Sequence, residues 1–84
     1  MDSSVSGIEY LGLRLRLARR GKGLTQKQLA QLSETSQEYI QMIENGRCRR
    51  PGTDPIMRIA EVLDVNPAWL QFGEPWAERR RPFV

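Results

Sequence analysis

The 84-residue sequence has no histidine and a single cysteine, Cys48. One cysteine cannot form an intramolecular disulfide, and without histidine neither a Cys/His zinc site nor a Ser-His-Asp triad can be assembled. No apolar run approaches the ~20 residues that span a bilayer, and residues 1–7 lack the basic and apolar regions of a signal peptide. We therefore expect no catalytic or metal site, no cofactor, no small-molecule substrate, no membrane partner and a cytoplasmic location.

The short chain also lacks room for more than one domain with a modest core, which disfavours a large substrate cavity. Its 39% hydrophobic and 27% charged residues are typical of a globular domain. We expect a flexible N-terminus over residues 1–7 and a folded domain over residues 8–73. Residues 74–84 contain two prolines and a run of charge, and we expect an extended basic tail there.

Acidic residues are missing between Glu9 and Glu34, whereas basic residues are frequent there: Arg14, Arg16, Arg19, Arg20, Lys22 and Lys27. A second basic cluster follows at Arg47, Arg49 and Arg50. Two such clusters on one face would attract a polyanion, and nucleic acid is the commonest polyanion for a small domain. Charge alone leaves open the alternative that these side chains merely make the exposed helix faces soluble.

Hydrophobic periodicity predicts a first helix over residues 8–20, with one apolar face formed by Ile8, Leu11, Leu15 and Ala18. Alternating leucines would also fit a strand. Leucine and arginine favour a helix, β-branched residues are nearly absent, and residues 21–23 supply a glycine stop. We expect Leu13 and Leu17 to extend the core rather than to meet a partner.

Capping residues indicate where the next helices begin. Thr25 and Gln28 have capping-box spacing before a helix over residues 26–32. The hydroxyl-rich residues 33–36 interrupt it and precede a third helix that ends near residue 44.

Two Asx-Pro pairs, at residues 54–55 and 66–67, are expected to cap and open a fourth helix and a short fifth one. The predicted core residues of the fourth helix and the turn after it are Ile56, Ile59, Leu63 and Val65.

Residues 26–45 have the pattern of a helix-turn-helix, in which Leu29, Ala30, Ile40 and Ile43 would be buried. Small Ala30 allows the two helices to approach closely, and the second helix would project its N-terminal polar side chains into a major groove.

At these residues the chain resembles the Cro and repressor proteins of lambdoid phages and their bacterial relatives, the XRE-type regulators. The resemblance covers Leu11 to about Glu74 and rests on Leu24-Thr25-Gln26, Gln28-Leu29-Ala30, Ser36-Gln37, Tyr39-Ile40, Ile43-Glu44-Asn45-Gly46 and Trp69-Leu70. It implies an all-α, compact five-helix lambda-repressor-like DNA-binding domain. It also implies a transcriptional regulator, most often a repressor, that binds a pseudo-palindromic double-stranded DNA operator as a homodimer.

The resemblance further implies that Gln37 reads a base edge, that Gln26 and Asn45 hold phosphates, and that an ion pair like Arg19–Glu44 joins the first and third helices. The chain departs from the family at the turn, where Glu34 stands in place of the usual glycine. A left-handed backbone at a residue other than glycine costs about 1 kcal/mol.

The predicted base-contacting residues are Gln37, Glu38, Gln41 and Met42. A Gln37 amide can bond adenine N6 and N7, and a Glu38 carboxylate can accept from cytosine N4 or simply stabilise its own helix N-terminus. Met42 can touch a thymine methyl group or be a poorly buried side chain.

The predicted phosphate-contacting residues are Gln26, Lys27, Ser36, Tyr39, Asn45, Arg47, Arg49 and Arg50. Gln26 lies at a helix N-terminus, where unpaired N–H groups and the helix dipole favour an anion. Two alternatives stay open, namely that Tyr39 only fills space in the core and that residues 47–50 form a merely solvated loop.

Three bulky apolar residues, Trp69, Leu70 and Phe72, crowd the short last helix, so we expect some of them to form a dimer interface. A rival hypothesis is a protein-interaction module, such as an antitoxin-like partner or an accessory domain of a larger regulator. Trp76, Phe83 and the arginine run at residues 79–81 motivate that hypothesis.

Overall fold

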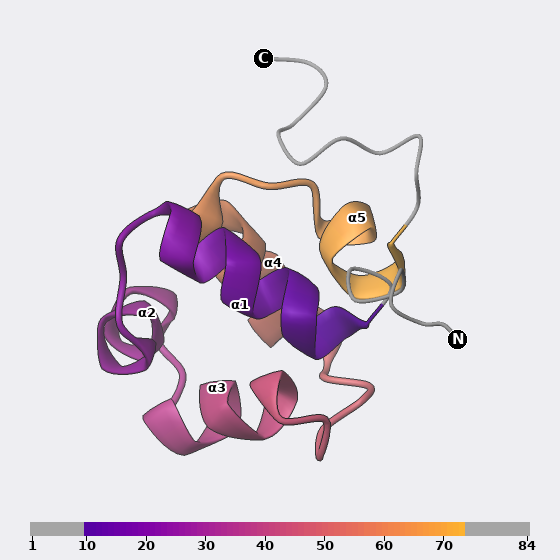
Figure 1. Cartoon of the computed structure of the whole chain (residues 1–84), viewed down its shortest axis with the longest axis horizontal. Coiled ribbons are helices and arrows are strands. Elements are labelled where there is room, and N and C mark those ends of the chain that lie inside the picture. Colours follow the sequence, from indigo (N-terminus) through magenta and orange to yellow (C-terminus); the bar gives the residue numbers. More distant parts are fainter. Residues whose placement is uncertain (1–9, 74–84) are drawn as a thin grey trace.

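The computed structural model describes residues 10–73 (Figure 1). The expectations for residues 1–7, for Ile8 and for the basic tail at residues 74–84 therefore lie outside the described part. That part contains five α-helices and no strand: α1 (Leu11–Gly21), α2 (Gln26–Ser33), α3 (Gln37–Glu44), α4 (Thr53–Leu63) and α5 (Pro67–Phe72). The predicted all-α fold is confirmed.

Every helix contributes to one apolar core. A single side chain from each helix has no exposed surface, namely Leu15, Leu29, Ile40, Ile59 and Leu70. Eight further buried apolar residues surround them: Leu11, Ala18, Ala30, Ile43, Ile56, Ala60, Leu63 and Val65. The core residues predicted for the helix-turn-helix and for the fourth helix with its following turn are all in this set.

Figure 1 shows α1 across the front of the molecule, with α4 behind it and α3 below it. The first helix packs against both α3 and α5, while α2 packs against α3 and α4. The longest helices of the described part, α1 and α4, have 11 residues each, and none there is long and apolar enough to traverse a bilayer.

Side-chain caps begin three of the helices. In the capping box of α2, the Gln28 amide donates to Thr25 Oγ1 at 3.0 Å, and the Thr25 amide donates to Gln28 Oε1 at 2.9 Å. Ser36 caps α3 through Oγ, and Asn66 caps α5 through Oδ1 with Pro67 in the first turn. Each cap satisfies N–H groups that have no partner within the helix.

The expected cap at residues 54–55 is wrong, because α4 begins at Thr53 with Gly52 in the capping position. Proline is tolerated throughout a first turn, where the missing N–H would have no intrahelical partner. Asp54 instead lies inside the first turn, where its carboxylate interacts favourably with the helix dipole.

The turn between α2 and α3 keeps the left-handed conformation without glycine, with Glu34 at φ 60° and ψ 41°. Neighbouring hydrogen bonds hold it in place. The Thr35 amide donates to the Ala30 carbonyl at 2.9 Å, and Arg58 Nε from α4 donates to the Ser33 carbonyl at 2.9 Å. The buried Ser33 hydroxyl donates to the Leu29 carbonyl at 2.7 Å. These bonds offset the strain and set the direction in which α3 leaves the turn.

Gly12 allows α1 to approach the end of α3. A Cβ at this position would lie 2.6 Å from the Ile43 carbonyl oxygen and 2.7 Å from that of Glu44, both backbone atoms. Sequence reasoning missed this contact, although a glycine inside a helical pattern is the signal for a close approach.

Two expectations about the outer residues of α1 are wrong. Leu17 is 42% exposed and Leu13 is only half-buried, so neither extends the core, because the neighbouring helices cover other faces of α1.

Arg14, counted above in the basic cluster, is 2% exposed. Its Nε donates to the Leu70 carbonyl at 2.8 Å and its Nη2 to the Gln71 carbonyl at 2.9 Å. Desolvation by burial lowers the pKa of Arg14, which here fastens α1 to α5.

Candidate nucleic-acid interface

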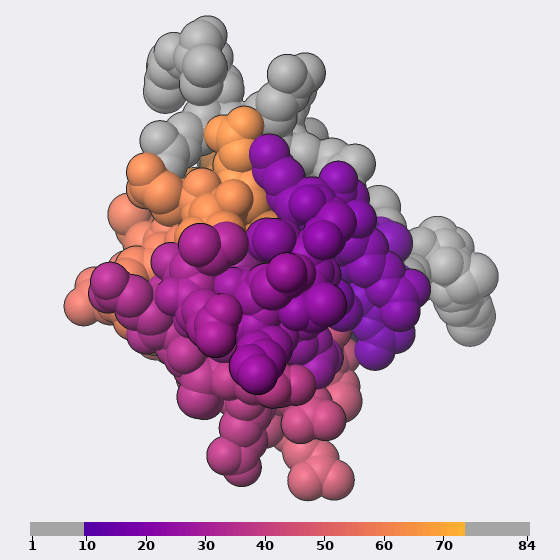
Figure 2. Space-filling model, turned by 90° about the vertical axis from the view of Figure 1, so that its left-hand side faces the viewer, coloured from indigo at the N-terminus to yellow at the C-terminus, as the bar shows by residue number. Residues whose placement is uncertain are grey.

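The third helix turns its two isoleucines inward and most of its polar residues outward. Ile40 and Ile43 are buried, whereas the predicted base-contacting residues are all exposed: Gln37, Glu38, Gln41 and Met42. In Figures 1 and 2, α3 and the loop after it form the lower end of the molecule. The N-terminal turn of α3 is therefore available to a groove of a duplex.

A hydroxyl cap and a partly buried tyrosine fix the start of α3. Ser36 Oγ accepts from the Tyr39 amide at 3.0 Å, and the Tyr39 side chain packs against the core while remaining half-buried. Burial, followed by the influence of Cys48, raises the pKa of the Tyr39 hydroxyl. That hydroxyl therefore stays protonated at neutral pH and can donate a hydrogen bond. The two alternatives for Tyr39 are compatible, because its ring packs inward while its edge stays accessible.

Glu44, at the end of α3, joins three segments. Arg19 Nε lies 2.7 Å from Glu44 Oε2, and Arg19 Nη2 lies 3.1 Å from Oε1. The fork of Arg19 thus meets both carboxylate oxygens, in the pairing that the resemblance implied. Gln26 Nε2 donates to Oε1 at 3.0 Å, and Arg16 Nε lies 3.6 Å from the same oxygen.

This cluster is buried, since the Glu44 side chain is 1% exposed and that of Arg19 10%. A bidentate arginine–carboxylate pair is strong, and removal of one partner would leave a buried charge without compensation. Arg19 also donates through Nη1 to the Leu24 carbonyl at 2.8 Å, which fixes the approach to α2. The pair therefore positions α2 and α3, and Arg19 is unavailable to a polyanion.

The start of α2 lies beside this cluster. Gln26 is half-buried because one N–H of its amide is directed to Glu44, whereas Lys27 is exposed. The second N–H of the Gln26 amide and the ammonium group of Lys27 remain as donors at a helix N-terminus.

The loop after α3 presents three exposed arginines, Arg47, Arg49 and Arg50. The amides of Arg47 and Cys48 both donate to the Met42 carbonyl, at 2.9 and 3.0 Å, and Cys48 packs partly buried against the core. Asn45 Oδ1 accepts from the Arg47 amide at 3.2 Å. Within residues 10–73 no carboxylate pairs with these arginines, so the positive charge of an ordered loop points outward next to α3.

The three residues predicted for a dimer interface lie in different environments. Leu70 has no exposed surface and belongs to the core, so its side chain cannot contact a partner. Trp69 is half-buried against the core, and Phe72 is 67% exposed. Sequence reasoning missed Tyr10, which is 66% exposed and lines the same groove as Phe72.

The chain matches the family model described as helix-turn-helix over residues 15–70. It is similar to the restriction-modification controller protein C.AhdI from Aeromonas hydrophila, with 35% identity, a TM-score of 0.68, and coverage of 77% of this chain and 97% of that one. The N-terminal DNA-binding domain of SinR from Bacillus subtilis is 27% identical, with a TM-score of 0.69 and coverage of 71% and 87%. The DNA-binding domain of the P22 C2 repressor is 21% identical with a TM-score of 0.71, which shows a shared fold.

Proposed function

The chain belongs to the helix-turn-helix family of DNA-binding transcriptional regulators, and we propose that it represses transcription by binding a pseudo-palindromic operator as a homodimer. The observation that carries this proposal is the exposed polar face of α3, held rigidly by the core between the start of α2 and the loop of exposed arginines. Regulation then needs only occupation of a promoter, in the compartment that holds the DNA of a bacterial cell, with no chemical step.

Base readout is assigned to Gln37, Glu38, Gln41 and Met42. Gln37 is the first residue of α3 and can present its amide to adenine N6 and N7, a contact worth ~1–3 kcal/mol of discrimination. Glu38 lies in the same turn and can accept from cytosine N4, and this bond offsets repulsion from the phosphates. Met42, 38% exposed one turn later, can contact a thymine methyl group.

Phosphate contacts are assigned to donors around α3: Gln26, Lys27, Ser36, Tyr39, Asn45, Arg47, Arg49 and Arg50. Gln26 and Lys27 lie at the start of α2, Ser36 and Tyr39 at the start of α3, and the other four at the end of α3 and in the loop after it. Donors around a recognition helix would hold the phosphates that border a major groove. The arginines supply the salt-dependent part of the affinity.

The dimer contact is assigned to Phe72 and the exposed edge of Trp69, since Leu70 is enclosed in the core. In a two-fold dimer on B-form DNA the two copies of α3 would lie about 34 Å apart, one helical turn. This arrangement predicts an operator made of two inverted half-sites.

Selection of bound duplexes from a random pool tests the proposal and supplies a probe. The expected result is enrichment of two inverted half-sites whose centres are about 34 Å apart. On the selected duplex, Gln37→Ala should weaken binding by about 5- to 150-fold, the equivalent of ~1–3 kcal/mol. The matched control is Gln31→Ala, which truncates an exposed glutamine on α2 and should bind as the parent does. Equal affinities for the two variants would contradict base readout by α3.

A further inference from the structure

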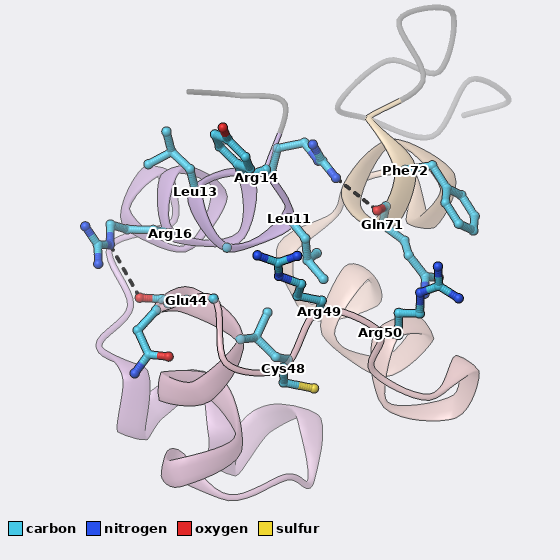
Figure 3. Close-up of a pocket in the computed structure, with 15 residues that line it drawn as sticks. Leu11, Leu13, Arg14, Arg16, Glu44, Cys48, Arg49, Arg50, Gln71 and Phe72 are labelled. Carbon is cyan, nitrogen blue, oxygen red and sulfur yellow. Dashed lines mark hydrogen bonds and ion pairs between the residues drawn. The ribbon is translucent and has the colours of Figure 1, made fainter. Parts of the chain in front are cut away.

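An open groove of about 840 Å³ lies between α1, the loop after α3 and α5 (Figure 3). Tyr10 and Phe72 line it and are 66% and 67% exposed, and Leu13 adds a half-buried aliphatic side chain. Two exposed aromatic rings along one hollow form an apolar surface that an occupant would remove from water.

Positive charge surrounds this surface. Arg16, Arg49 and Arg50 line the groove, and in Figure 3 the latter two extend from the loop. Among the described residues that line the groove, the only carboxylate belongs to Glu44, which is 1% exposed, pairs with Arg16 at 3.6 Å and already accepts from Arg19 and Gln26. The groove therefore suits an occupant with both apolar and acidic side chains, and it repels a second copy of the same basic rim.

Two segments of the chain outside the described residues continue from this groove. Residues 1–9 join it at Tyr10, and residues 74–84 follow Gly73, next to Phe72. The C-terminal segment has three arginines against two glutamates and is repelled by the rim. The N-terminal segment has two acids, Asp2 and Glu9, no basic side chain, and the apolar residues Val5 and Ile8.

We propose that, in the DNA-free monomer, residues 1–9 dock in this groove of their own chain, with the acids near Arg49 and Arg50 and the apolar side chains against Tyr10 and Phe72. DNA phosphates and the dimer partner use the same side chains, so they displace this segment when the regulator binds its operator. The reach is sufficient, because the five residues from Tyr10 back to Val5 span up to about 18 Å. A short tether gives an effective concentration in the millimolar range, so weak contacts are enough to fill the groove.

Cys48 makes the proposal testable, because it is the only cysteine of the chain and it lines the groove. In the full-length Val5→Cys variant, mild oxidation with oxidised glutathione should form an intramolecular disulfide with Cys48. The matched control is Ala77→Cys, which is four residues from Gly73, whereas Val5 is five from Tyr10. We expect the Val5→Cys disulfide to form at least tenfold faster than that of the control.

The ratio of the two disulfide-formation rates is then measured again for Val5→Cys and Ala77→Cys in an Arg49→Glu/Arg50→Glu background. Any change that these substitutions cause in the reactivity of Cys48 affects both variants and cancels in the ratio. In that background the tenfold ratio should fall to one or below, because the reversed rim repels residues 1–9 and attracts the arginines of residues 74–84. In the parent background, 1 M salt should also reduce the ratio. A ratio near one in the parent background, a ratio that survives both charge reversals, or a disulfide that links two chains would overturn the proposal.

A second measurement needs no added thiol. Asp2→Asn/Glu9→Gln should increase the rate at which an aromatic disulfide reagent labels Cys48 several-fold, since the groove would be less often occupied. Glu74→Gln/Glu78→Gln removes the same charge from the other segment and should leave that rate unchanged. Equal rates in the two double variants would count against docking of residues 1–9.

Discussion

Replacement of Gly12 by alanine should destabilise the protein, although alanine is the better helix former. Helix propensity alone favours Gly→Ala by about 1 kcal/mol within a helix. At Gly12, however, the new Cβ would lie 2.6 and 2.7 Å from two backbone carbonyl oxygens of α3, where ordinary contacts begin at 3.4 Å. Backbone atoms cannot rotate aside as a flexible side chain can, so α1 and the end of α3 must separate.

The magnitude follows from the two opposing effects. Overpacking of this kind costs about 1–3 kcal/mol, and the helix preference returns up to about 1 kcal/mol of it. The separation also disturbs Glu44, whose buried pair with Arg19 depends on the distance between α1 and α3. We therefore expect the free energy of unfolding of Gly12→Ala to fall by about 1–2 kcal/mol.

Gly21→Ala is the matched control, because Gly21 is the last residue of the same helix and a Cβ added there would have no atom within 4 Å. Its unfolding free energy should rise by about 0.5–1 kcal/mol. In urea, with a slope of about 1 kcal/mol/M for a domain of this size, the midpoint should fall by about 1–2 M for Gly12→Ala and rise by about 0.5–1 M for Gly21→Ala. A Gly12→Ala midpoint at or above that of the parent would refute the close-approach argument.

Three more predictions concern the turn, the buried pair and the arginine loop. Glu34→Gly should raise the free energy of unfolding by up to about 1 kcal/mol, because relief of left-handed strain exceeds the added freedom of the unfolded chain. A lower melting temperature than that of the parent would contradict this prediction. Glu44→Gln should lower it by about 3 kcal/mol, because Arg19 would lose its buried counter-charge, and a change below about 1 kcal/mol in urea titrations would oppose this. Arg49→Ala should reduce the slope of log affinity for DNA against log salt by about 0.9, while Lys22→Ala, at the far end of α1, should keep the parental slope.

Features that depend on neighbours in the chain were predictable from sequence. The capping box and the second Asx-Pro start rest on contacts across two or three residues, so the starts of α2 and α5 agree with expectation. The buried residues of the helix-turn-helix follow from periodicity in the same way. The start of α4 was not predicted correctly, because an acid and a proline are as acceptable inside the first turn of a helix as at its cap.

The candidate site shows the same division. The exposed positions of α3 follow from its periodicity, since its apolar residues already define the inner face. Periodicity does not predict which arginines are buried and which are exposed. Arg14 and Arg19 are buried whereas Arg20 is exposed, because only the first two meet acceptors brought in by α5 and α3. Leu70 likewise fills the core because α1 and α4 enclose α5 from two sides.

Local sequence thus determined that this chain forms short helices, where most of them begin and which face of each is apolar, because those properties depend on backbone geometry and residues a few positions apart. Tertiary structure alone decided which arginines serve as internal ties and which remain exposed to a polyanion. It also decided that Gly12 must have no side chain and that Tyr10 and Phe72 share a groove. These outcomes depend on atoms distant in the chain, whose positions are set only when the helices pack together.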